Sequence, residues 1–145
     1  KATIGVGALN LSKRQEVLSI LKPTLIRSKS EVQRRFAACG ENTECGGQAM
    51  RGNTFLIDQL VRIIFDVATI QAYPTANKST SEKLSIVAVG GYGRTELAPF
   101  SDIDLLFLLP YRLTPRVEQI IESMLLLMVT YNVRILSHPS DVVSE

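Results

Sequence analysis

The sequence has few of the residues from which disulfide frameworks and zinc sites are built. Its 145 residues include two cysteines, Cys39 and Cys45, and one histidine, His138. Two thiols and one imidazole are too few for a disulfide scaffold or for the four ligands of a structural zinc site. The cysteines are separated by five residues within a glycine-rich loop and have no histidine nearby, which argues against a redox or metal role. The default expectation is therefore a reducing, cytoplasmic setting.

Long apolar runs are also missing, as is a large excess of one charge. The most apolar stretches, residues 103–109 and 124–129, are far shorter than the ~18 residues that a membrane crossing needs. The amino terminus shows no basic region followed by an apolar stretch and a small-residue cleavage site. The formal net charge is +2, and the 16 Lys and Arg residues are dispersed rather than gathered in a stripe. We expect no membrane partner and no nucleic-acid partner.

The remaining composition is that of an ordinary globular protein, with 46% hydrophobic and 21% charged residues. The amino-terminal third indicates two modest helices. Apolar residues share one helical face over residues 12–21 before Pro23 ends the pattern, Ser30 can cap a second helix, and Gly40 can stop it. Residues 40–53 contain four glycines and no periodic pattern, which predicts a loop or linker.

We therefore predict an arm over residues 1–53 and a folded domain over residues 54–145. Apolar spacing and turn residues in the domain predict a helix, two strands, a second helix and a third strand. The first strand is almost continuously apolar, which predicts that both of its faces are covered. This order predicts an α+β fold with a mixed sheet and flanking helices. The predicted ranges are 54–73 for the helix capped by Thr54, 84–89 and 103–109 for the two strands, 115–131 for the second helix and 133–136 for the last strand.

The chemically informative residues follow the first of these strands and begin the second. The first strand ends in Gly90 and Gly91, and ten residues separate Gly91 from the acidic pair Asp102 and Asp104. Glycines after a strand allow the backbone to turn tightly and approach a ligand, and their N–H groups can hold phosphate oxygens. Arg94 can supply a cation for a triphosphate. Because side chains alternate along a strand, Asp102 and Asp104 are expected on the same face.

The acidic pair indicates a cation site. Two carboxylates on one face of a strand are costly unless a cation neutralises them, and such oxygen ligands suit Mg²⁺ together with substrate phosphates. Two such ions can activate an attacking oxygen and stabilise a leaving pyrophosphate. A glycine-rich turn alone is more often simply a turn, but the combination with an Asp-x-Asp pair on an apolar strand is harder to explain without a ligand. Together they predict phosphoryl or nucleotidyl transfer from a nucleoside triphosphate.

These residues also resemble a known family signature. Gly90-Gly91 followed by Asp102-x-Asp104 is similar to the signature of the DNA-polymerase-β-like nucleotidyltransferase superfamily. The longer run Val-Gly-Gly-Tyr-Gly-Arg-x-Glu-Leu-x-Pro-x-Ser-Asp-Ile-Asp-Leu-Leu-Phe-Leu, which begins at residue 89, closely resembles the amino-terminal catalytic domain of the PII uridylyltransferase family. The resemblance is specific over residues 84–122 and weaker on either side.

The resemblance implies a polymerase-β-like nucleotidyltransferase core that transfers UMP from UTP to a tyrosine hydroxyl of the trimeric PII signal protein, as part of glutamine and nitrogen sensing. It also implies that two Mg²⁺ ions bind with UTP. Tyr92 is expected to be a packing residue that shapes the turn. The residues carried over by position are Gly90 and Gly91 for the triphosphate, Arg94 and Ser101 as helpers in nucleotide binding, and Asp102 and Asp104 as the catalytic, metal-binding carboxylates.

The sequence departs from the family pattern in two places. Thr95 stands where the family usually has glycine, and a β-branched residue is strained there if the position requires a positive φ. Where the family has Gly-His-x-x-Arg after the third strand, this chain reads Ser137-His138-Pro139-Ser140-Asp141. His138 is expected to be structural rather than catalytic. The predicted strand over residues 133–136 carries no third carboxylate.

Three interpretations of function follow. The first is the uridylyl transfer that the resemblance implies, and the second is a related transfer such as that of the glutamine synthetase adenylyltransferases. The third is a catalytically silent module that binds a nucleotide or a protein. In the uridylyltransferase family, a uridylyl-removing phosphohydrolase domain and glutamine-sensing ACT domains follow the transferase domain, and none of their sequence is present here. The late position of the motif leads us to expect a fragment truncated at its carboxyl end.

Overall fold

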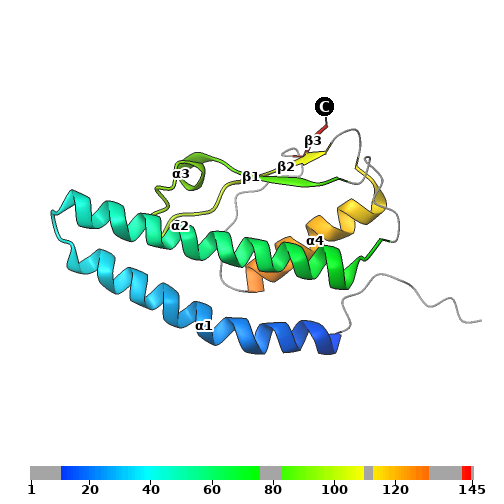
Figure 1. The fold of residues 1–145 in the computed structure, drawn as a ribbon, viewed down its shortest axis with the longest axis horizontal. Helices are drawn as coiled ribbons and strands as arrows, with labels where there is room; N and C mark the ends of the chain where they lie inside the picture. The colour runs from blue at the N-terminus through cyan, green and yellow to red at the C-terminus, as the bar shows by residue number, and fades with distance from the viewer. Residues whose placement is uncertain (1–10, 76–82, 110–112, 131–141, 145) are drawn as a thin grey trace, which may run out of the picture.

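The computed structural model describes residues 11–75, 83–109, 113–130 and 142–144. Two long helices, α1 (Leu11–Ala38) and α2 (Thr43–Asp66), run side by side, and α2 lies between α1 and a small sheet (Figure 1). No helix within these residues is long and apolar enough to cross a membrane. The other elements are the π-helical segment η1 (Val67–Ala72), the short helix α3 (Gly90–Gly93), helix α4 (Pro115–Thr130) and the strands β1 (Ser85–Ala88), β2 (Leu105–Leu109) and β3 (Val142–Ser144).

The sheet is mixed, as the order of elements predicts. Its strand order is β1-β2-β3, with β1 antiparallel to β2 and β2 parallel to β3. Along β1 the exposed residues Ser85 and Val87 alternate with partly buried ones, so the prediction that both faces of this strand are covered is wrong. Val87 retains 36% of its surface, because the helices pack on the opposite face. The predicted strand over residues 133–136 lies outside the described residues.

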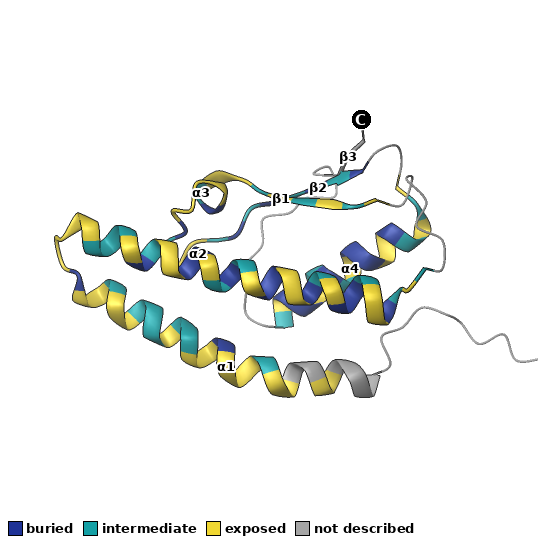
Figure 2. Cartoon of the chain, in the orientation of Figure 1, coloured by how far each residue is buried: buried dark blue, intermediate teal, exposed yellow. Residues whose placement is uncertain are grey.

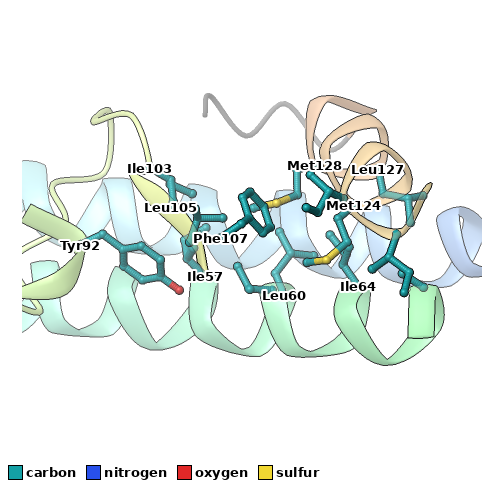
Figure 3. Close-up of a cluster of buried hydrophobic side chains, with 14 of the residues drawn as sticks. Ile57, Leu60, Ile64, Tyr92, Ile103, Leu105, Phe107, Met124, Leu127 and Met128 are labelled. Carbon is teal, nitrogen blue, oxygen red and sulfur yellow. The ribbon is translucent and has the colours of Figure 1, made fainter. Parts of the chain in front are cut away.

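The core lies between the sheet, α2 and α4 (Figures 2 and 3). Residues on β2 alternate strictly, with Leu105, Phe107 and Leu109 buried. Most of the regularly spaced apolar residues from which the helix over 54–73 was predicted are buried, although Ile63 faces solvent. Helix α4 begins at Pro115 as predicted. The Thr114 hydroxyl accepts a hydrogen bond from the N–H of Val117 at 3.4 Å, and this helix buries a similar stripe. The residues it buries are Val117, Ile120, Ile121, Met124, Leu127 and Met128.

Helix α1 contradicts the prediction of two short helices. It continues through Pro23 and through Ser30, which therefore caps nothing. Proline removes one helical hydrogen bond, but Leu25 is buried in the core just beyond it, and partly buried Leu21 packs against the core just before it. Tertiary packing on both sides of the proline thus holds the helix together. The predicted stop at Gly40 is confirmed, since Gly40 follows the helix with a φ of +53°.

The prediction of a linker over residues 40–53 is also wrong. Helix α2 begins at Thr43, and the Asn42 side chain caps it by accepting a hydrogen bond from the N–H of Cys45 at 3.0 Å. The boundary predicted before Thr54 falls inside this helix, so Thr54 is not a cap. A disulfide that the sequence analysis did not expect joins Cys39 to Cys45, with 5.5 Å between their Cα atoms. It ties together the turn that connects α1 to α2.

Candidate functional site

The glycine turn and the acidic pair are adjacent because β1 and β2 pair antiparallel. The pairing continues past the end of β1, where the N–H of Val89 donates to the carbonyl oxygen of Asp104 at 3.1 Å. Gly90 follows with a φ of +61°, and a Cβ added there would collide with Oδ2 of Asp104. The Asp104 carboxylate therefore lies directly against the backbone of Gly90. Any residue with a side chain at position 90 would be strained and would displace this carboxylate.

The backbone of the turn is closed by its own hydrogen bonds. The N–H groups of Gly93 and Glu96 donate to the carbonyl oxygens of Val89 and Gly91, each at 2.9 Å. A Cβ at Gly93 would lie 2.5 Å from the carbonyl oxygen of Ala88, so this position also requires glycine. The N–H groups of Gly90 and Gly91 come first in α3, where no carbonyl of the same helical turn is available to them. These two amides are the ones that a phosphate could use.

The acidic pair lies just before β2, on the side of the chain that faces away from the core. Ile103 and Leu105 are buried, whereas Asp102 and Asp104 are only partly buried, as the alternation predicts. One carboxylate oxygen of Asp102, Oδ1, is nevertheless sealed from solvent. A carboxylate held against a glycine backbone and another with a buried oxygen form the kind of oxygen donor set that suits Mg²⁺.

The donor set is limited to two carboxylates. Within the described ranges, no group of three or more His, Cys, Asp or Glu residues could hold a metal ion. A pair is sufficient for Mg²⁺, because this ion usually retains water and takes substrate phosphates as its other ligands. His138, which matches the family pattern, and Asp141, which departs from it, lie outside the described residues.

Arg94 and Ser101 are less closely tied to the carboxylates. The guanidinium of Arg94 is exposed and lies 3.4 Å from Oε2 of Glu96, so it forms a surface ion pair in this state. Ser101 is exposed, and its N–H donates to the carbonyl oxygen of Ala98 at 3.1 Å. The structure thus brings Gly90 and Asp104 into contact, but it places Arg94 beside Glu96.

Tyr92 is the packing residue that the sequence analysis expected. Its ring is buried beside Ile57 of α2 (Figure 3), and its hydroxyl donates to Oδ1 of Asp58 at 2.7 Å. Burial raises the pKa of the Tyr92 hydroxyl, and the hydrogen bond to Asp58 raises it further. The hydroxyl therefore stays protonated and joins the glycine turn to α2. Asp58 could not be predicted as its partner from the sequence.

Thr95 adopts the conformation in which a β-branched residue is strained. Its φ is +61°, in the left-handed region that favours glycine. The hydroxyl donates to the carbonyl oxygen of Arg94 at 2.6 Å, which is a local contact within the same turn. The condition for strain at this position, a positive φ, is therefore met.

Three further hydrogen bonds join two residues of α2 to the loop beside the site, and none of them was predicted from the sequence. The side-chain amide of Asn53 donates to the carbonyl oxygens of Leu97 and Ala98, at 3.1 and 3.2 Å. The hydroxyl of Thr54 accepts a hydrogen bond from the N–H of Leu97 at 3.3 Å. The available signal was spacing, since Asn53 lies four residues before buried Ile57 and continues its stripe. The glycines within residues 40–53 masked this spacing, because they predicted a loop.

Comparison with known proteins agrees with this geometry. A family model described as "Nucleotidyltransferase domain" matches residues 70–143, which include the glycine turn and the acidic pair. The chain is 45% identical over 116 residues to the bifunctional uridylyltransferase/uridylyl-removing enzyme of Rhodospirillum rubrum, covering 80% of this chain and 12% of that protein. Enzymes with the same name from Erythrobacter litoralis and Azospirillum brasilense are 46% and 48% identical over 112 residues, covering 77% of this chain and 12% of each enzyme. No solved structure gives a significant match.

Proposed function

The chain belongs to the nucleotidyltransferase domain family, and on this premise we propose that it is a uridylyltransferase unit with a polymerase-β-like core. The proposed reaction transfers UMP from UTP to a tyrosine hydroxyl of the PII signal protein in the cytoplasm. The chain spans about 12% of the length of its uridylyltransferase relatives. Their name supports UTP as the nucleotide, and the run of residues that begins at Val89 supports PII as the acceptor.

The contact between Gly90 and Asp104 is the observation that carries this proposal. It supports treating the glycine turn and the acidic pair as a single site, because the amides proposed to bind phosphate lie next to the Asp104 carboxylate proposed to bind metal. Asp102 and Asp104 would hold Mg²⁺, which neutralises the triphosphate and the leaving pyrophosphate. The N–H groups of Gly90 and Gly91 would hold phosphate oxygens, with Arg94 and Ser101 assisting.

The proposed transfer breaks one bond and forms one. The tyrosine oxygen of the acceptor bonds to the α-phosphorus of UTP, the bond from that phosphorus to the bridging oxygen breaks, and pyrophosphate leaves. The hydroxyl proton goes to solvent or to a carboxylate of the site. The chain's own contribution is to fix the phosphates at Gly90 and Gly91 while the carboxylates just before β2 hold charge beside them.

Binding of MgUTP tests the proposal directly. We expect MgUTP to raise the melting temperature of the chain, and Asp102→Asn together with Asp104→Asn to abolish the increase. Glu118→Gln is the matched control, because Glu118 is an exposed carboxylate on α4. Absence of an increase in the parent chain, or an unchanged increase in the double variant, would overturn the proposal.

Competition and transfer experiments separate the three interpretations. Preference for ATP over UTP would favour an adenylyltransferase instead. Binding of MgUTP without transfer of labelled UMP to PII, tested with this chain in its natural full-length protein, would indicate a silent binding module. The strained Thr95 is the observation that motivates this last alternative.

A further inference from the structure

The loop that joins the glycine turn to the acidic pair is held by helix α2. The proposed function assigns no role to this helix. This loop comprises residues 96–101, and it is attached to the fold through Leu97. The side chain of Leu97 is 2% exposed in the core, its N–H donates to Thr54, and its carbonyl oxygen accepts from Asn53. Both backbone polar groups and the side chain of one loop residue are therefore fixed by the fold.

The same contacts extend to the residue before the acidic pair. The carbonyl oxygen of Ala98 accepts both the Asn53 amide and the N–H of Ser101. The tight turn over residues 98–101 is thus attached to α2 at its first residue, and Asp102 follows its last. Pro99 restricts the backbone inside this turn, since its ring fixes φ. The backbone between Ala98, which Asn53 holds, and Asp102 is therefore conformationally restricted.

The position of Asn53 is itself informative. It is 4% exposed and lies on the stripe of α2 that otherwise buries apolar side chains. A buried amide contributes stability only while its hydrogen bonds are made, whereas an apolar residue there would be stabilised by packing alone. The two carbonyl oxygens that it holds belong to the loop that leads to the metal-binding carboxylates, which is where accurate placement affects affinity.

We propose that Asn53 and Thr54 are positioning residues that hold the loop over residues 96–101 and thereby place Asp102 for metal and nucleotide binding. The proposal rests on the proposed function. In this role neither residue contacts the ligand. They act through Leu97 and Ala98, in the way that residues behind a metal ligand fix its orientation.

Binding of Mn²⁺, used as a paramagnetic probe in place of Mg²⁺, tests this role without relying on turnover. Free Mn²⁺ is measured by electron paramagnetic resonance while the 145-residue chain is titrated in the presence of UTP. We expect Asn53→Ala to weaken Mn²⁺ binding about tenfold, the lower end of the effect of residues behind a metal ligand. Thr54→Val should weaken it less, and Thr54→Ser, which retains the hydroxyl, should bind like the parent.

Val61→Ala is the matched control, because Val61 is buried on the same helix but makes no contribution to the loop hydrogen bonds. It should lower the melting temperature and leave Mn²⁺ affinity unchanged. Affinities of Asn53→Ala and Thr54→Val equal to that of Val61→Ala, at equal folded fraction, would overturn the positioning role alone. Absence of UTP-dependent Mn²⁺ binding in the parent would instead overturn the proposed function and this proposal with it. If Asn53→Ala does not fold, the comparison of Thr54→Val with Thr54→Ser decides the question.

Discussion

The glycine turn (residues 89–96) and the helical hairpin formed by α1 and α2 both contain several glycines, but the two regions use them differently. In the turn, Gly90 and Gly93 occupy positions where a Cβ would collide with neighbouring atoms. In the hairpin, Gly46 and Gly52 lie inside α2 with no neighbouring atom within 4 Å of an added Cβ. The backbone of the turn is therefore determined residue by residue, whereas that of the hairpin is determined by packing along its whole length.

The largest expected effect tests whether the turn is as restricted as this comparison implies. Gly93→Ala places a Cβ against the carbonyl oxygen of Ala88, and backbone atoms cannot move aside as a side chain can. We expect a loss of about 3 kcal/mol in the free energy of unfolding, at the upper end of over-packing effects. Urea denaturation measures it.

Gly91→Ala is the control for this prediction within the same turn. Its added Cβ would lie 3.4 Å from the carbonyl oxygen of Glu96, which is close to ordinary contact. The change in stability should stay within about 1 kcal/mol, since alanine also favours helical backbone. Equal losses for the two variants would show that the turn is not selective and would remove the distinction from the hairpin.

The second prediction concerns the residue of the turn that does not fit. Thr95 has a φ of +61° without being glycine. Thr95→Gly should raise the free energy of unfolding by about 1.5 kcal/mol, because left-handed backbone costs an L-residue about 1–2 kcal/mol. Thr95→Ala retains a Cβ and should give only a small part of this gain. A loss of stability in Thr95→Gly would show that the hydroxyl contact to Arg94 outweighs the strain.

The contrast between the two regions also explains which features could be predicted from the sequence. The turn and the acidic pair were identified because glycines, an arginine and two aspartates at fixed spacing have local physical requirements. The family's usual glycine at position 95 raised the question of a positive φ there, and Thr95 has one. The apolar stripe of α4 was equally predictable, since its spacing matches the face that this helix buries. The site contacts of Asn53 and Asp58 were not readable, because each spans more than thirty residues and depends on how α2 packs.

The hairpin was misread for the opposite reason. Pro23 and the glycines of residues 40–53 are unfavourable in helices, and local propensity therefore predicted breaks. Burial of residues such as Leu25 and Ala49 overrides these preferences, each of which amounts to only about 1–3 kcal/mol. Helix propensity thus describes only the local preference of each segment, and packing outweighs it in the folded chain.

The third prediction measures the energetic cost of glycine in the hairpin. Gly52→Ala should raise the free energy of unfolding by about 1 kcal/mol, because the position is helical and has open space around it. Gly40→Ala also meets open space, but its φ of +53° should reverse the sign and cost about 1 kcal/mol. Thermal or urea denaturation gives both values. Changes of the same sign would show that φ does not control the difference.

The smallest expected effect involves the charged surface of α1. Glu31 accepts hydrogen bonds from Arg34 at 2.8 Å and from Arg35 at 2.7 Å, and these contacts lower the pKa of its carboxyl from 4.5 to about 2. Because the pKa is lower in the folded chain, the stabilisation is fully present above pH 4.5 and is lost as the pH falls through about 2. Glu31→Gln should therefore lower the melting temperature slightly near pH 6 and not at all below pH 2.

Salt provides the control for this last effect. All three side chains are substantially exposed, so the ion pairs are screened and 1 M salt should remove most of the difference between Glu31→Gln and the parent. The stability changes of Gly93→Ala and Thr95→Gly arise from steric contact and backbone strain and should not respond to salt in this way. A difference for Glu31→Gln that persists in 1 M salt and at pH 2 would show that Glu31 acts through packing of α1 rather than through its charge.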